Sequence, residues 1–471
     1  MPSEGDDHDS RGRLAEPSAR RYRVRHRRLP GAGAHRTGAV LLAALAPALT
    51  GLLLLHLLWP THWSARGGGG RWLVLADSVM LVSVGLAELF LLVNAVAVAY
   101  AASVARDPAP VAPEPGTPAA LLITYVPGGE PLSAVRRTLE GAVRVRHPGP
   151  LDVWLLDEGD DPEARMLCAE LGVHHFTRLG VPEWNQEEGP HRAGTKHGNH
   201  NAWLAKHGDA YEILAAVETG HVPRPGFLER TTGYFRDPDV AFVVGRRADA
   251  SGGTDAARWS RPSPFDVLVQ RAGNRHGTPV LAGTGAVLRV AALRGAGGFH
   301  GSDAEDLTTG FEIHRLRNPS TGRYWLSVRT PDARPAQGGP ALPAERAARR
   351  PVPAPATSGV LLRQYGKALF STGPGRLLSY TLTLLRRPVT AATRLLGALS
   401  LLLACTHTAM GVWAVLPLAT ALLPGVVPAL TAVRSRGSRR AEGGSPAVRP
   451  VRETDAKTEP ALAATTPAGG N

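Results

Sequence analysis

Long apolar stretches lie near both ends of the chain, on either side of a middle part in which short apolar runs alternate with polar segments. Two of them come early, at Gly38 to Trp59 and at Trp72 to Tyr100, and another extends from Leu395 to Val433. A helix that crosses a bilayer needs about 20 apolar residues. The pattern therefore predicts two transmembrane helices within 38–104 and a transmembrane hairpin at 395–433.

The middle part, from Ala119 to residue 330, has a different periodicity. Apolar runs that are typical of buried strands alternate with amphipathic segments. The strands are expected at 119–126, 151–157, 211–218 and 240–246, and the helices near 131–146, 161–171, 196–207 and 305–318. This order is typical of an α/β domain with an open, mostly parallel sheet.

The remaining segments are polar or rich in proline and glycine. The Arg-rich residues 1–37 are interpreted as a disordered tail, with a basic membrane-docking arm as the alternative. The others are a linker at 105–118, a loop and acceptor-side segment at 331–374, an interfacial amphipathic helix at 375–387 and a disordered tail at 434–471.

The positive charge follows the apolar stretches. The formal net charge is +13, and arginines gather before Gly38 and after Val433. Cytosolic flanks of transmembrane helices collect such charge, so membrane topology explains it better than a nucleic-acid partner does. We expect a multi-pass protein of the cell membrane with the α/β domain and both termini in the cytosol. The two cysteines support neither a disulfide framework nor a cysteine metal site.

Acidic residues follow two of the predicted strands. Asp157 and Glu158 end one strand, and Glu218 ends another. In open parallel sheets, ligands bind outside the carboxyl ends of the strands. Each acid-and-glycine turn alone is also ordinary loop chemistry, so the order of several such segments carries more information.

That order resembles the catalytic module of bacterial cellulose synthases, which are family 2 glycosyltransferases. The segments that resemble it are Thr124-Tyr125, Asp157-Glu158-Gly159, Lys196-His197-Gly198-Asn199, His221 to Arg230, Gly283 to Arg289 and Ala304-Glu305-Asp306. The resemblance covers about 119–320. It implies a GT-A-like fold, inserted between transmembrane helix pairs, that binds a nucleotide sugar.

The resemblance also implies roles for single residues. Asp157 and Glu158 would bind the donor, with Asp157 at the nucleotide base, and Lys196 would lie near the diphosphate. Asp306 would be the general base that takes the proton of the acceptor hydroxyl, at a helix N-terminus that favours the ionised carboxylate. Glu305 has capping-box spacing from Ser302, so we assign it to structure.

Two motifs depart from the family pattern. The family's Asp-x-Asp reads Glu218-Thr219-Gly220 here, so Glu218, with His221, is the candidate ligand set for a weakly bound Mn²⁺ or Mg²⁺ at the donor diphosphate. The family's Gln-x-x-Arg-Trp is matched by Gln364 and Tyr365, which are the candidate acceptor-binding residues.

These features lead to two hypotheses. The first is an inverting, membrane-bound glycosyltransferase that moves a sugar from a nucleotide donor, implied to be a UDP-sugar, to a saccharide or lipid-linked acceptor. The second is a catalytically impaired pseudo-glycosyltransferase that serves as a binding or scaffold subunit of a polysaccharide synthase. The expected partners are the nucleotide sugar, the acceptor, the lipid bilayer and other synthase subunits, but no nucleic acid.

Overall fold

The computed structural model describes most of the chain before residue 331. The described residues are 14–17, 22–28, 71–129, 131–245, 264–281, 285–301, 305–331, 336–338, 373–381 and 383, with scattered helical residues between 44 and 55. The predicted hairpin at 395–433 and the predicted tail at 434–471 lie outside these residues.

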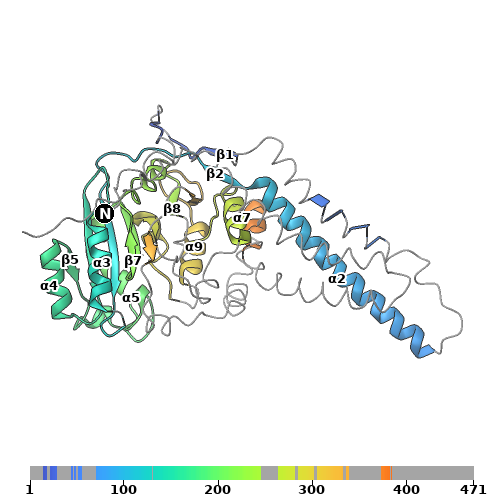
Figure 1. Ribbon diagram of the computed structural model, residues 1–471, viewed down its shortest axis with the longest axis horizontal. Helices are drawn as coiled ribbons and strands as arrows, with labels where there is room; N and C mark the ends of the chain where they lie inside the picture. Colours follow the sequence, from blue (N-terminus) through green and yellow to red (C-terminus); the bar gives the residue numbers. More distant parts are fainter. Residues whose placement is uncertain are drawn as a thin grey trace, which may run out of the picture. The chain divides into compact units, whose positions relative to one another are not determined.

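A seven-stranded sheet forms the centre of the α/β domain (Figure 1). Its strand order is β10-β8-β9-β6-β3-β4-β5. Neighbouring strands are parallel except at β9, which is antiparallel to both β6 and β8. The strands are β3 (Ala119–Tyr125), β4 (Leu151–Asp157), β5 (His174–Phe176), β6 (Ile213–Glu218), β8 (Val240–Val244), β9 (Ala286–Arg289) and β10 (Leu326–Arg329). The prediction of an α/β fold with a mostly parallel sheet is confirmed.

Helices cover both faces of this sheet, because side chains of alternate strand positions point to opposite faces. Leu121 and Ile123 of β3 pack in the core under α3 and α4, whereas Leu122 packs in a second core under α5, α8 and α9. The helices are α3 (Leu132–Ala142), α4 (Pro162–Leu171), α5 (Lys196–His207), α7 (Pro264–Gly273), α8 (Val290–Gly295) and α9 (Glu305–Arg315). Short 3₁₀ turns lie at Pro182–Trp184, Gly208–Ala210 and Thr232–Arg236.

Local sequence signals explain where these helices begin and end. The Asp161 side chain accepts a hydrogen bond from the Glu163 N–H at the start of α4, and Pro162 is its first residue. Gly172 ends the helix with a φ of 66°. A capping acid, an N-terminal proline and a left-handed glycine are the usual boundaries of a helix.

Part of the N-terminal segment packs against the domain, which differs from the disordered tail expected for 1–37. β1 (His26–Arg28) pairs antiparallel with β2 (Arg106–Pro108). The Arg23 guanidinium binds the buried carboxylates of Asp237, at 2.7 Å, and Asp239. The sequence did not predict this contact because Arg23 lies in a run without apolar periodicity.

The second apolar stretch is helical throughout. It lies within α2 (Arg71–Val104), and the Tyr100 hydroxyl at its far end lies 2.8 Å from His276 Nε2, beyond the end of α7. Among the helices in the described part of the chain, none is long and apolar enough to cross a membrane.

The segment from 374 is helical to 381 in the described residues, within the amphipathic helix expected at 375–387. Its Arg376 donates to the carbonyl oxygens of His314 (2.7 Å) and Trp325 (2.8 Å), and its Tyr380 is buried against Phe311. One face of this segment therefore packs on α9. A two-stranded ribbon, β7 (His221–Pro223) with β11 (Ala336–Gly338), completes the described strands.

Candidate active site

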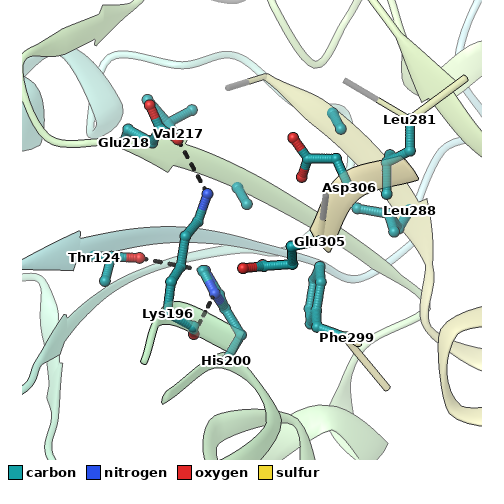
Figure 2. Close-up of a pocket in the computed structure, with 12 residues that line it drawn as sticks. Thr124, Lys196, His200, Val217, Glu218, Leu281, Leu288, Phe299, Glu305 and Asp306 are labelled. Carbon is teal, nitrogen blue, oxygen red and sulfur yellow. Dashed lines mark hydrogen bonds and ion pairs between the residues drawn. The ribbon is translucent and has the colours of Figure 1, made fainter. Parts of the chain in front are cut away.

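A pocket opens at the carboxyl ends of β3 and β6, where the fold predicts a ligand site. Its empty volume is about 390 Å³, part of which is open to solvent. Figure 2 shows its polar residues, which come from the ends of two strands and the first turns of two helices: Thr124 of β3, Glu218 of β6, Lys196 and His200 of α5, and Glu305 and Asp306 of α9. Lys196, Glu218 and Asp306, which the sequence had singled out separately, lie together here.

Lys196 is the first residue of α5, and its position is fixed by the cap of that helix. The Thr195 side chain accepts a hydrogen bond from the Gly198 N–H at 3.2 Å. A Cβ at Gly198 would come within 2.2 Å of the Arg192 carbonyl oxygen, so the loop before α5 can approach only a glycine. The cap and the glycine together hold the lysine at the mouth of the pocket.

The Lys196 ammonium forms an ion pair with Glu218. Nζ lies 3.1 Å from Oε1, and each side chain keeps roughly a third or more of its surface exposed, 35% and 41%. Burial alone would lower the pKa of Lys196, but the negative charges of Glu218, Asp306 and Glu305 outweigh it and raise the pKa. The lysine is therefore held in its charged form.

Glu305 and Asp306 extend from the first turn of α9 into the pocket, and the Glu305 carboxylate points toward the Lys196 and His200 side chains (Figure 2). Burial raises the pKa of Glu305 to about 7; the Lys196 charge opposes this shift, and the charges of Asp306 and Glu218 add to it. The capping partner expected for Glu305, Ser302, lies outside the described residues. Glu305 thus belongs to the pocket lining, a place that the sequence had given to Asp306 alone.

His200 and Thr124 are pocket residues to which the sequence motifs gave no role. His200 Nδ1 lies 3.0 Å from the Lys196 carbonyl oxygen, so Nδ1 carries the proton, and Nε2 accepts from the Thr124 hydroxyl at 3.3 Å. Burial and the Lys196 charge lower the pKa of His200 to about 3. A neutral histidine beneath the lysine adds no competing charge. Its position four residues after Lys196, one helical turn on, was the available signal.

Asn201 ties α5 to the segment that precedes α9. Its side-chain amide donates to the Phe299 carbonyl oxygen at 2.8 Å and accepts from the Phe299 N–H at 2.7 Å. The neighbouring Gly298 has a φ of 91°, and a Cβ there would lie 2.4 Å from Asn201 Oδ1. Phe299 lines the pocket, so this contact ties α5 to a second segment of the pocket wall.

Asp157 ends β4 outside the pocket lining and is fully buried. Its carboxylate accepts from the N–H groups of Gly159 (3.0 Å) and Asp161 (2.6 Å), and it lies 3.0 Å from His175 Nε2. These bonds shape the turn after β4. The role at the nucleotide base that the resemblance implies for Asp157 stays a prediction.

Glu158 organises the loop that leads to Lys196. Its carboxylate binds both Nε and Nη2 of Arg178, whose side chain is 1% exposed. The same guanidinium donates to the carbonyl oxygens of Arg192 (3.0 Å) and Thr195 (3.2 Å). Glu158 therefore acts on the site through Arg178 and the start of α5, and a direct contact with the donor stays a prediction.

Glu218 offers a divalent ion fewer protein ligands than the two carboxylates of the family's Asp-x-Asp. Gly220 has no side chain, and the Thr219 hydroxyl donates to the Thr124 carbonyl oxygen at 2.5 Å. His221 starts the ribbon strand β7 and is not among the lining residues. The ligand atoms of Glu218, Glu305 and Asp306, all described, do not come together at metal-site spacing. The ligand set expected from the sequence, Glu218 with His221, stays a prediction.

In the described part of the chain, the group with metal-ligand spacing is Asp157, Asp160 and His175, whose ligand atoms lie within 4.8 Å of one another. Asp160 also pairs with Arg165, and Asp157 holds the turn described above. This group lies outside the pocket lining. Gln364 and Tyr365, the predicted acceptor residues, lie outside the described residues.

Comparison with known proteins supports the resemblance. The chain is 29% identical over 200 residues to the UDP-forming cellulose synthase catalytic subunit of Xanthomonas axonopodis pv. citri, which covers 40% of this chain and 25% of that protein. It is 28% identical over 221 residues to cellulose synthase 1 of Komagataeibacter xylinus, which covers 45% of this chain and 13% of that protein. The chain thus spans a quarter or less of these relatives. No family model matches it.

Solved structures show a weaker likeness. A mannosyltransferase from Pyrobaculum calidifontis, solved with GDP-Man and Mn²⁺, is 15% identical, covers 69% of this chain and 90% of its own, and has a TM-score of 0.40. Glucosyl-3-phosphoglycerate synthase from Mycobacterium tuberculosis, solved with Mn²⁺ and UDP, is 10% identical with a TM-score of 0.35 and covers 53% and 80%. The predicted resemblance to cellulose synthase-like glycosyltransferases is confirmed by the sequence similarities.

Proposed function

We propose that the chain is an inverting glycosyltransferase that uses a nucleoside-diphosphate sugar. One observation carries the proposal: a fixed cation, Lys196, and the carboxylate of Asp306 line the same pocket at the carboxyl ends of the parallel strands. Transfer of a sugar needs both, because negative charge develops on the leaving diphosphate while a proton leaves the acceptor. The similarity to cellulose synthase catalytic subunits supports this reaction class and a uridine nucleotide.

In the proposed reaction, Asp306 removes the proton of an acceptor hydroxyl. The oxygen forms a bond to the anomeric carbon as the bond from that carbon to the diphosphate oxygen breaks, and the nucleoside diphosphate leaves with the bonding electrons. Lys196 stabilises the negative charge of the departing diphosphate. Attack opposite to the leaving group inverts the anomeric centre.

The acceptor side of the proposal rests on the sequence. The apolar stretches at 38–59 and 395–433 and the arginines that flank them support a protein of the cell membrane with its α/β domain in the cytosol. A membrane enzyme would meet a lipid-linked or growing saccharide acceptor there. Other synthase subunits are proposed partners, also because of the predicted membrane location.

A scaffold subunit is the second candidate, favoured by the glycine at position 220, where the family carries a metal-binding aspartate. The two functions predict different results in one assay. Detergent-purified full-length protein is incubated with a panel of nucleotide sugars, lipid extract and oligosaccharides, and release of nucleoside diphosphate is measured. We expect release with one donor. No release with any donor, together with co-purification of an intact transferase, would favour the scaffold.

A further inference from the structure

The Lys196 ammonium lies against the carboxylate that stands at the first position of the family's Asp-x-Asp. Nζ is 3.1 Å from Glu218 Oε1, and the second position is Gly220. We propose that this pocket binds the diphosphate of its nucleotide without a divalent ion, with Lys196 as the main positive charge at the diphosphate. The inference rests on the proposed function and concerns how the same site holds its donor.

The ammonium and a divalent ion compete for the same place. Two cations that share one carboxylate oxygen repel each other strongly at such short range. A divalent ion at Glu218 Oε1 would therefore compete with Lys196, which also lies in the field of Glu305 and Asp306. The lysine is part of the chain and, unlike a free ion, loses no translational entropy when it pairs with Glu218, which favours the ammonium.

The loss of the second carboxylate is not a consequence of crowding. A Cβ at Gly220 would have no atom of the described residues within 4 Å, although the φ of 83° disfavours most side chains. Aspartate and asparagine tolerate this region of φ better than other residues. A second carboxylate would therefore have space at position 220. The residue there is a glycine, and the Lys196 ammonium lies beside the first carboxylate, Glu218.

The first turn of α5 adds to the positive potential at the same point. Lys196 opens this helix of 12 residues, and the macrodipole places partial positive charge at its N-terminus. Helix N-termini bind phosphate groups through this charge and their N–H groups. The ammonium and the helix N-terminus thus both provide positive potential for a diphosphate. In a metal-dependent site, the metal ion contributes to this potential.

Titration calorimetry tests the inference. UDP is titrated into full-length, detergent-purified protein in EDTA and, separately, in Mn²⁺, and GDP and ADP are titrated in the same way. We expect one nucleotide to bind with affinities that agree within about threefold between the two conditions, a difference below 1 kcal/mol. Binding that EDTA abolishes and Mn²⁺ restores would overturn the inference and leave the proposed function intact. No binding of any nucleotide in either condition would contradict the proposed function itself.

A pair of variants tests the role of the lysine directly. Lys196→Met keeps the length of the side chain and removes the charge, so we expect the affinity in EDTA to fall by about tenfold or more, as for loss of a charged hydrogen bond. Mn²⁺ should restore part of the loss, because the ammonium no longer competes for Glu218. The control, Lys196→Met with Glu218→Ala, should not respond to Mn²⁺. Wild-type affinity of Lys196→Met in EDTA would contradict the inference.

Discussion

The Asn201 side chain binds both backbone polar atoms of Phe299, at 2.8 Å to the carbonyl oxygen and 2.7 Å to the N–H. The side-chain amide thus pairs with the Phe299 backbone as a neighbouring strand would. It links α5 to the segment that leads to α9. Lys196 lies one and a half turns before Asn201, and Asp306 lies seven residues after Phe299. This contact therefore ties the helix that carries Lys196 to the segment that precedes α9.

Replacing Asn201 by leucine should reduce turnover more than nucleotide binding. The change leaves a buried N–H and a buried carbonyl oxygen without partners, at a cost of about 1–3 kcal/mol each. Because the lysine stays on α5 and α9 is displaced, we expect kcat to fall while the affinity for nucleoside diphosphate changes little. Calorimetry and the release assay separate the two effects. An equal loss in both would show that Asn201 serves general stability only.

Two bidentate arginine–glutamate pairs of this chain allow a matched comparison of stability. Arg178 with Glu158 is buried, whereas Arg136 with Glu170 is 44% and 56% exposed, with both N–O distances at 2.7 Å. Arg178→Met should cost about 3–5 kcal/mol, because it leaves a largely buried carboxylate unpaired. Arg136→Met should leave the melting temperature near that of the wild type, because solvent screens exposed pairs. Melting in detergent measures both, and equal effects would contradict the role of Arg178.

Glu305 should make the stability depend on pH. Its pKa is raised from 4.5 to about 7, so between these values the folded protein holds a proton that the unfolded chain has released. Stability therefore falls as the pH rises from about 4.5 to 7, and the loss is complete above 7. Glu305→Gln removes this pH-dependent contribution to the stability, because the amide does not titrate. The melting temperature of the variant minus that of the wild type should increase from pH 5 to pH 8, and a difference that stays constant would show that the pKa is not raised.

Gly220→Asp should convert the pocket to metal dependence. The added carboxylate fits the open space and, with Glu218, provides two ligands for Mn²⁺. We expect Mn²⁺ to strengthen nucleotide binding of this variant by about tenfold or more, which corresponds to 1.4 kcal/mol. Gly220→Asn has a similar shape and backbone strain without the charge, and it is the control. An equal response of both variants to Mn²⁺ would show that the new carboxylate is not a ligand.

The parallel sheet and its first helices could be predicted from the sequence because their signals are local. The run Leu151 to Asp157 is a strand in the prediction and in the structure. Helix α5 begins at Lys196 and ends at His207, as expected. The order of elements then follows from the βαβ rule. β9 was not predicted as an antiparallel strand, because four residues carry little periodicity and its direction depends on the pairing partners β6 and β8.

Part of the pocket lining was singled out from the sequence, but the electrostatics of the pocket were not predicted. Motif order identified Lys196, Glu218 and Asp306 without showing that the first two form an ion pair. The contacts that depend on distant segments were missed as well: Asn201 lies 98 residues from Phe299, and Arg23 lies 214 residues from Asp237. Such pairs leave no pattern in a single sequence, since nothing local to either residue requires the other.

The most direct test of the account is Asp306→Asn, measured with the donor that the wild type accepts. The amide keeps the shape of the side chain but cannot take a proton, so we predict that release of nucleoside diphosphate falls by about 10²–10⁴-fold, the usual contribution of a general base. Nucleotide affinity should stay within about threefold of the wild type, because Lys196 is unchanged. Undiminished release in Asp306→Asn, with the same donor and acceptor, would contradict the assignment of this pocket as a glycosyltransferase active site.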